Sequence, residues 1–225
     1  MKIALIGYGK MGHIIEETAL ERGHRIVARI DKDNICDFDS PVFADADVAI
    51  EFTTPTTAEN NILRSWERGV PVVCGTTGWD VEGVKAKMPL SMGLIWTSNY
   101  SLGVNILFAL NRRLAQIMHA YPEYAPSIVE THHIHKLDAP SGTAKTLAEE
   151  LKGACERLHG EVPIESIREG EVPGIHTVSW ESEVDSLSLT HSAKSRKGFA
   201  LGAVIAAEWL KGKKGFHTMQ EVLGL

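Results

Sequence analysis

Cysteine is scarce in this chain, and the few cysteines lie far apart. The 225 residues include three of them, Cys36, Cys74 and Cys155, and no C-x-x-C pair occurs. This spacing argues against a cysteine-based zinc site and against a disulfide framework. Few and dispersed thiols are typical of a protein in a reducing compartment.

Long apolar runs and an excess of positive charge are also lacking. The opening stretch, MKIALIGYGKMG, holds an apolar run too short for a signal peptide, and no later stretch reaches the length of a membrane span. The net charge of −6 provides no basic surface for nucleic acid or for an anionic membrane. We therefore expect a cytoplasmic protein that binds neither nucleic acid nor membrane.

What the chain does have is an ordinary globular composition and a regular alternation of short strands and helices. Its residues are 44% hydrophobic and 23% charged, and its length suits one large domain or two modest ones. Short apolar runs separated by helical segments predict a parallel sheet that helices cover on both faces. The expected strands are 2–6, 25–31, 47–53, 71–77 and 93–99, and helices are expected near 11–22 and 56–68.

The alternation changes after about residue 102. A long helix is expected at 103–119, a strand at 127–136, a helix from about residue 141, strands within 162–191 and a final helix at 199–210. Strands that cluster after helices predict an α+β domain with a mainly antiparallel sheet. The expected fold class is thus α/β. A Rossmann-type doubly wound domain spans residues 1–102, completed by 197–225, and a smaller α+β domain spans residues 103–196.

A glycine-rich turn joins the first expected strand to the first expected helix. Gly7, Gly9 and Gly12 fit the pattern G-x-G-x-x-G in that context. The first glycine permits a tight turn, the second lets the backbone approach a pyrophosphate, and the third lets helix and strand pack closely. The phosphates would bind the free N–H groups and the positive dipole end of the helix. The turn therefore predicts a dinucleotide site.

An acidic residue stands where a dinucleotide site needs one. Asp31 ends the second expected strand, 19 residues after Gly12, and an acid there accepts hydrogen bonds from the adenosine ribose. Asp31 favours NAD, whereas the nearby cations Arg29 and Lys32 could meet the additional phosphate of NADP. The sequence leaves both NADH and NADPH open as the cofactor.

Three polar loops follow later strands of the same expected sheet. Open parallel sheets bind ligands outside the carboxyl ends of their strands, so these loops would face the nicotinamide and its ribose. Ordinary turn chemistry produces the same composition, however. The cofactor-binding residues that this interpretation predicts are Phe52, Gly75, Thr76, Thr77, Thr97, Ser98, Asn99 and Tyr100.

Titratable residues crowd into the segment ETHHIHKLDAPSGTA, residues 130–144. If 127–136 is a strand, its period of two places Glu130, His132 and Lys136 on one face, with His133 and His135 on the other. A lysine and a histidine on one face form a compact cationic site, which suits a small anion such as a carboxylate.

A helix start follows this cluster directly. Ser141 can cap the helix, and Gly142 and Thr143 lie in its first turn, where unpaired N–H groups can hold a carboxylate. The segment therefore combines two means of holding an anion with two proton carriers, His132 and Lys136.

Other interpretations of this segment stay open at this point. Its three histidines could bind a metal, but adjacent strand residues point to opposite faces, and we predict no metal site. A Ser–Lys hydrolase would use Ser141 with Lys136 or Lys145, but no nucleophile elbow or oxyanion loop is evident. A polar strand before a capped helix would also need no function.

The combination of motifs resembles the dihydrodipicolinate reductase family over nearly the whole chain. The resemblance depends on E-x-H-H-x-x-K-x-D-A-P-S-G-T-A, C-G-T-T-G, S-N-Y-S-x-G-V-N, the late T-H-x-A-x-S-R and the glycine turn. It implies reduction of 4-hydroxy-tetrahydrodipicolinate to tetrahydrodipicolinate with NADH or NADPH, in diaminopimelate and lysine biosynthesis. It also implies a homo-oligomer built on the sheet of the second, substrate-binding domain.

The resemblance implies residue roles by position. His132 would handle a proton, Lys136 would be the cationic proton donor, and the substrate would contact His133, Gly142 and Thr143, with Ser141 beside them. The adenosine and phosphate side of the cofactor would lie on Gly7, Tyr8, Gly9, Lys10, Met11, Gly12, Asp31 and Lys32. The stretch 168–174 is compressed relative to the family pattern, which predicts a smaller second sheet.

Two competing functions stay open. Another two-domain dehydrogenase acting on a small carboxylate would share the dinucleotide site but would not need the Ser-Gly-Thr helix start beside H-H-x-x-K. A non-catalytic dinucleotide sensor would keep residues 7–12 and would have no use for Lys136 beside His132.

Overall fold

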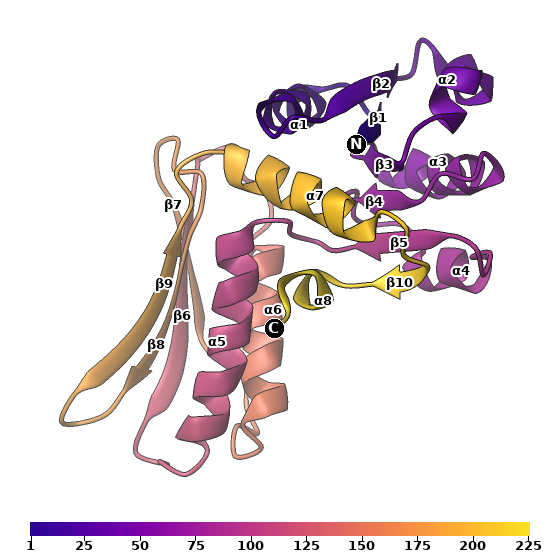
Figure 1. Ribbon diagram of the computed structural model, residues 1–225. Coiled ribbons are helices and arrows are strands. Elements are labelled where there is room, and N and C mark those ends of the chain that lie inside the picture. The colour runs from indigo at the N-terminus through magenta and orange to yellow at the C-terminus, as the bar shows by residue number, and fades with distance from the viewer. The chain divides into compact units, whose positions relative to one another are not determined.

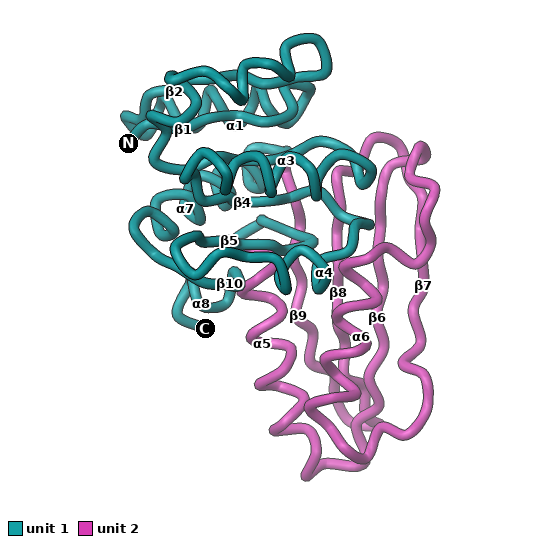
Figure 2. The backbone as a smooth tube through the Cα atoms, turned by 90° about the vertical axis from the view of Figure 1, so that its right-hand side faces the viewer, with its two compact units in different colours: residues 1–102, 196–225 teal, residues 103–195 magenta.

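The structure is a computed structural model that describes residues 1–225, and it divides into two compact units. Residues 1–102 and 196–225 form the first unit, and residues 103–195 form the second (Figure 2). No helix in either unit combines the length and the apolar character that crossing a membrane would require.

The first unit is built on a six-stranded sheet in which every neighbouring pair of strands is parallel. Along the sheet the strand order is β10-β5-β4-β3-β1-β2. The strands are β1 (Lys2–Ile6), β2 (Arg25–Ile30), β3 (Val48–Glu51), β4 (Val72–Cys74), β5 (Gly93–Trp96) and β10 (Gly215–His217). The predicted Rossmann-type parallel sheet is confirmed, and β10 is a strand that the sequence pattern did not predict.

Helices cover both faces of this sheet (Figure 1). One face packs against α1 (Lys10–Glu21), α7 (Lys197–Leu210) and α8 (Met219–Leu223). The other packs against the short η1 (Ile35–Asp39), α2 (Pro41–Ala44), α3 (Pro55–Glu67) and α4 (Val81–Ala86). Every residue of β3 and β4 is buried, as expected for central strands covered on both sides. The carboxyl ends of β1, β3 and β4 therefore emerge together at one edge.

The second unit is a four-stranded mixed sheet with two helices on one face. Strands β6 (Ala125–His132), β7 (Ile164–Arg168), β8 (Ile175–Glu181) and β9 (Ser186–Ser192) run in the order β7-β6-β8-β9. Only the β6–β7 pair is parallel, so the sheet is mostly antiparallel, as predicted. Helices α5 (Leu102–Met118) and α6 (Gly142–Ala154) stand side by side against it (Figure 1).

Strand β6 alternates strictly between a buried and a half-buried face. Ile128, Glu130 and His132 share the buried face, so two polar side chains end an otherwise apolar row. His176 of β8 is buried opposite Glu130, its partner in the register. The sheet thus gathers buried titratable groups at one end.

The predicted strand 127–136 is too long, because β6 ends at His132. Its neighbour β7 ends at Arg168, the partner of His132, and the pairing with β8 ends at Thr131, so no strand continues the ladder. The chain then turns, and the backbone N–H of Lys136 donates to the carbonyl of His133 at 3.1 Å. Lys136 therefore lies in a loop, and placing it on one strand face with His132 was wrong.

Candidate active site

The glycine turn of the first unit has the close approaches that the motif predicts. Gly7 has a φ of +90°, and a Cβ there would overlap the carbonyl oxygen of Phe52. A Cβ at Gly12 would overlap the carbonyl oxygen of Gly7, so the helix can approach the strand only with glycine at this position. A Cβ at Gly9, in contrast, would meet nothing within 4 Å. The open side of the turn is therefore at Gly9.

Helix α1 starts at this open side without a side-chain cap. Gly9 is the N-cap residue, and it offers no side-chain acceptor to the first amides. Unpaired N–H groups and the helix dipole favour an anion there. The residues present fit the diphosphate of a dinucleotide.

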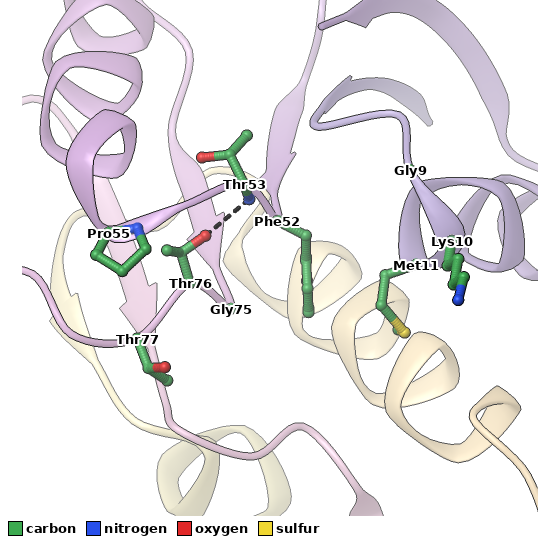
Figure 3. A pocket seen from close by; sticks show the side chains of 9 residues that line it. All are labelled: Gly9, Lys10, Met11, Phe52, Thr53, Pro55, Gly75, Thr76 and Thr77. Carbon is green, nitrogen blue, oxygen red and sulfur yellow. Dashed lines mark hydrogen bonds between the residues drawn. The ribbon is translucent and has the colours of Figure 1, made fainter. Parts of the chain in front are cut away.

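A cavity of about 350 Å³ opens between the glycine turn and the loops that follow β3 and β4 (Figure 3). The amide of Thr53 donates to Oγ1 of Thr76 at 2.8 Å and ties the two loops together. The Phe52 ring occupies the space that a Cβ of Gly75 would fill. The residues that line the cavity are Gly9, Lys10, Met11, Phe52, Thr53, Pro55, Gly75, Thr76 and Thr77, and all but Thr53 and Pro55 are predicted cofactor residues.

A buried carboxylate supports these loops from inside the sheet. Glu51, the last residue of β3, is completely buried, and its carboxylate accepts from the hydroxyl of Thr53 and lies 3.0 Å from Sγ of Cys74. Burial and the neighbouring Glu51 raise the pKa of the Cys74 thiol well above its ordinary value. Cys74 is therefore a protonated donor, and Glu51 fixes the start of both loops.

The remaining predicted cofactor residues lie at the ends of β2 and β5. Asp31 and Lys32 directly follow β2 and are exposed. After β5, the amide of Asn99 donates to Oγ1 of Thr97 at 3.2 Å, and Ser98 is exposed. The Tyr100 side chain is buried, and its hydroxyl donates to the carbonyls of Cys74 and Ile95. Tyr100 thus secures the loop and has only its backbone to offer to a ligand.

In the second unit, the completely buried Glu130 is the centre of a polar cluster. Its Oε1 accepts from the amide of Ser141 and from Nη2 of Arg168, each at 3.1 Å. Burial alone would raise the pKa of Glu130, but the hydrogen bonds from Ser141 and Arg168 help to lower it to about 2. Glu130 is therefore a carboxylate at all physiological pH values.

Two imidazoles flank the second oxygen of this carboxylate. Nδ1 of His132 lies 2.8 Å and Nε2 of His176 lies 3.9 Å from Oε2 of Glu130. The His132 contact is close, but it lacks the alignment of a hydrogen bond. On the other side of His132, a Cβ at Gly174 would come within 3.1 Å of Nε2, so glycine leaves room beside this nitrogen.

Both imidazoles are held neutral. Burial lowers the pKa of His132 below its usual value and the charges of Lys136 and Arg168 lower it further, while the charges of Glu130 and Asp138 oppose them. Burial and the neighbouring His132 lower the pKa of His176 to about 4. At neutral pH, His132 can therefore accept or relay a proton but does not carry a stored one.

Lys136 supplies the positive charge of the site from a loop that Arg168 holds in place. The Arg168 guanidinium donates to the carbonyl oxygens of Lys136 at 3.3 Å and of Asp138 at 2.6 Å, besides binding Glu130. Nζ of Lys136 lies 2.8 Å from Oδ1 of Asp138, and the lysine side chain is 23% exposed. Lys136 is thus oriented but still accessible to a ligand.

Helix α6 begins beside this cluster, as predicted. Ser141 is its N-cap, and the serine Oγ accepts from the amide of Ala144 and lies 3.2 Å from Nε2 of His176. Gly142 and Thr143 form the first turn, and a Cβ at Gly142 would meet nothing within 4 Å. His133 lies immediately after β6, and His135 is exposed and pairs with Glu171 at 3.0 Å.

The donor atoms of Glu130, His132 and His176 all lie within 4.8 Å of one another, which raises the question of a metal ion. The Arg168 guanidinium already binds the carboxylate, and the charge of Lys136 acts on both imidazoles. A divalent cation would have to compete with these two positive charges. The cluster is better suited to an anion outside it than to a metal within it.

Sequence reasoning assigned roles to His132, Lys136 and the helix start, but it gave no role to Glu130, Arg168 or His176. Glu130 was predicted to share a strand face with His132, and this shared face was the sequence signal that could have identified Glu130 as part of the site. Arg168 and His176 come from other strands, and only the register of the sheet brings them to Glu130.

Comparison with known proteins gives one family for both halves of the chain. The family model "Dihydrodipicolinate reductase, N-terminus" matches residues 1–100, and "Dihydrodipicolinate reductase, C-terminus" matches residues 103–223. A 4-hydroxy-tetrahydrodipicolinate reductase of Christiangramia forsetii is 47% identical over 99% of this chain and 98% of its own length. One of Akkermansia muciniphila is 37% identical over 96% of this chain and 95% of its own length.

Solved structures support the same fold. A dipicolinate-bound dihydrodipicolinate reductase from Paenisporosarcina sp. TG-14 superposes with a TM-score of 0.80, covers 98% of both chains and is 23% identical. At that identity the superposition shows the fold, and the sequence relatives show the family.

Proposed function

Because the chain belongs to the dihydrodipicolinate reductase family, we propose that Lys136, His132 and the amino end of α6 carry out its reaction. That reaction is the reduction of 4-hydroxy-tetrahydrodipicolinate with NADH or NADPH, in lysine biosynthesis. When bound, the reduced nicotinamide supplies the hydride. The glycine turn with its open Gly9 and the loops tied by Thr53 and Thr76 would hold this cofactor.

The observation that carries the assignment is the cluster in the second unit. A neutral imidazole lies 2.8 Å from the buried carboxylate of Glu130, and the N-cap Ser141 of α6 donates its amide to the same carboxylate. The charge of the Lys136 ammonium group acts on that imidazole. The substrate would be a small cyclic dicarboxylate, in line with the dipicolinate of the solved relative. One of its carboxylates would accept from the first amides of α6 at Gly142 and Thr143, and His133 would contact it from the β6 side.

In the net reaction the hydride replaces the 4-hydroxyl group of the substrate, which leaves as water, so one proton is consumed. The residues of the chain would supply and direct this proton. The Nζ of Lys136 would donate this proton to the substrate while its charge draws electron density away from the reacting bond. His132 would then accept or relay a proton through Nε2, the nitrogen beside Gly174. Glu130 would act as a positioning residue, because its charge lies 2.8 Å from Nδ1 of the ring, and its complete burial would keep it from contacting the substrate.

A steady-state assay tests the function. The purified chain is mixed with 4-hydroxy-tetrahydrodipicolinate and either NADH or NADPH, and oxidation of the nicotinamide is followed by absorbance. Substrate-dependent oxidation with at least one of the two is expected. No oxidation with either would contradict the proposed function, and oxidation that requires another small carboxylate would reassign the substrate.

Association of copies and location in the cell belong to the proposal as well. Helices α5 and α6 cover one face of the second sheet, while the other face presents half-buried or exposed residues such as Val129, Ile167 and Ile175. We assign this face to a homo-oligomer in the cytoplasm, where the three free cysteines stay reduced. Light scattering would give a multiple of 24.7 kDa, and a monomer would contradict the assignment.

A further inference from the structure

An ion pair beside the glycine turn plays no part in the site described so far. Nε of Arg29, on β2, donates to Oε2 of Glu16, on α1, at 2.8 Å, and the second guanidinium nitrogen binds the other carboxylate oxygen. The hydroxyl of Tyr8, within the glycine turn, donates to the same carboxylate. Arg29 also lies over the Tyr8 ring, 5.7 Å from its centroid. The guanidinium is thus engaged on both its edge and its face.

This ion pair lies where a dinucleotide fold distinguishes its two cofactors. Strands β1 and β2 are parallel neighbours, and the register pairs Leu5 with Arg29, close to the edge at which the glycine turn begins. In such folds the adenosine ribose lies between the glycine turn and the end of the second strand. An acid there binds the 2′-hydroxyl of NADH, and an arginine there accommodates the 2′-phosphate of NADPH.

The pairing takes the arginine away from that role. The Arg29 guanidinium lowers the pKa of Glu16 to about 2, and the Glu16 side chain is only 13% exposed, so this carboxylate stays charged. The Tyr8 hydroxyl directs its proton to Glu16 and offers none to a phosphate. The carboxylate occupies Nε and Nη2 of Arg29, one of the edges through which a guanidinium binds a phosphate in a bidentate way, and its negative charge repels a phosphate at the remaining donors.

We propose that Glu16 withholds Arg29 from the 2′-phosphate, so that the chain selects NADH over NADPH. The proposal rests on the proposed function, because it specifies which nicotinamide the dinucleotide site takes. Asp31 adds a second negative charge at the end of β2. Lys32 is the remaining cation there, is exposed, and attracts a phosphate only weakly through solvent.

The test measures the dissociation constants of NADH and NADPH for the purified chain by fluorescence titration. Wild type should bind NADH more tightly. Glu16→Gln removes one charge and frees the guanidinium, and it should tighten NADPH about three- to tenfold while NADH changes by less than about twofold. The ratio of the two constants is the readout, because a general loosening of the glycine turn would weaken both nucleotides together.

Two further variants separate release of Arg29 from a simple loss of negative charge. Glu17→Gln removes the same charge from the next position of α1, where Glu17 pairs with Lys197, and should leave the ratio unchanged. Glu16→Gln combined with Arg29→Gln should return the ratio toward that of wild type, because the released guanidinium is then missing.

The outcomes are distinct. Three results would overturn this inference and leave the proposed function standing. The ratio of the two dissociation constants could stay unchanged in Glu16→Gln, NADPH could bind the double variant as tightly as it binds Glu16→Gln, or the wild type could prefer NADPH. A wild type that binds neither nucleotide would overturn both.

Discussion

The imidazole of His132 is subject to opposing influences that can be assigned to individual residues. Burial and the charges of Lys136 and Arg168 favour its neutral form, while Glu130 favours the protonated form. Since the pKa is lowered overall, the ring is neutral at neutral pH and becomes protonated only on acidification. Activity that needs neutral His132 must therefore decline on the acidic side.

Replacing Glu130 by Gln tests this balance. The variant removes the influence that raises the His132 pKa, so the acidic limb of the pH profile of kcat/KM should move to lower pH. The rate at neutral pH should fall by about tenfold, a part of the 10²–10⁴ that general acid–base groups contribute. Steady-state kinetics across the pH range measures both.

The exposed Glu149 of α6 provides the matched control for this variant. Glu149→Gln makes the same chemical change and should leave the profile in place. A Glu130→Gln limb that stays at the wild-type pH, or that moves upward, would remove Glu130 from its positioning role.

At the scale of the element, the start of α6 has one residue that stabilises the fold and a neighbouring residue that is proposed to contact the substrate. Ser141 caps the helix and is tied to Glu130 and His176, whereas the neighbouring Gly142 has open space where a Cβ would be. The small residue is therefore not demanded by the packing of the unliganded chain. The ligand proposed for the start of α6 would account for it.

Gly142→Ala should raise KM by about tenfold, or about 1.4 kcal/mol of binding, because the methyl group enters the space of the bound carboxylate. The melting temperature should stay equal or rise slightly, since alanine has the higher helix propensity. Gly153→Ala, at the far end of α6, also adds a methyl in open space and should change neither KM nor kcat. A Gly142→Ala variant with wild-type KM would exclude the helix start from the substrate site.

Elements with a strong local signal could be predicted from the sequence, and those without one could not. The glycine turn and strands β1 to β5 follow from short apolar runs and breakers. The short β10 has no such signal, because it is defined by its pairing with β5. Helix α8 was not predicted either, although Thr218 and Glu221 form a capping box and Gly224 ends the helix. The end of β6 was misplaced for a related reason, since the polar residues after His132 continue the alternation while the neighbouring strands stop.

At the scale of the whole molecule, buried ionisable groups link stability to pH. His176 has a pKa of about 4 in the folded chain against an ordinary value of 6.5, so the unfolded chain takes up the proton first. Its contribution is complete above pH 6.5 and is lost as the pH falls to about 4. Glu130, with its pKa lowered from 4.5 to about 2, loses its contribution only below pH 4.5.

Chemical denaturation between pH 7 and pH 4 should therefore show a decline to which His176 contributes up to about 3 kcal/mol. His176→Gln cannot take up a proton, so its free energy of unfolding should decline less over that interval. His119→Gln, at an exposed position after α5, should keep the wild-type slope. Equal slopes for wild type and His176→Gln would show that this imidazole is not held neutral by the fold.

The cofactor and substrate sites could be predicted only where the sequence also implies the order and direction of the strands. The loops after β3 and β4 could be assigned to the cofactor because carboxyl ends of parallel strands share one edge. Arg168 and His176 could not be assigned to the site from the sequence. They lie beside Glu130 because of the mixed strand order β7-β6-β8-β9, and no local sequence pattern predicts that order. Likewise, Arg29 was a candidate for the NADP phosphate until the structure paired it with Glu16.

The central claim is that the ammonium group of Lys136 gives its proton to the dicarboxylate during reduction. The most direct measurement is kcat for the wild type, Lys136→Ala and Lys145→Ala with 4-hydroxy-tetrahydrodipicolinate and saturating NADH; Lys145 is exposed on α6 and serves as the control. Lys136→Ala should lose about 10²–10⁴ in kcat, and Lys145→Ala should retain the wild-type value. Turnover of Lys136→Ala close to that of the wild type would contradict the account.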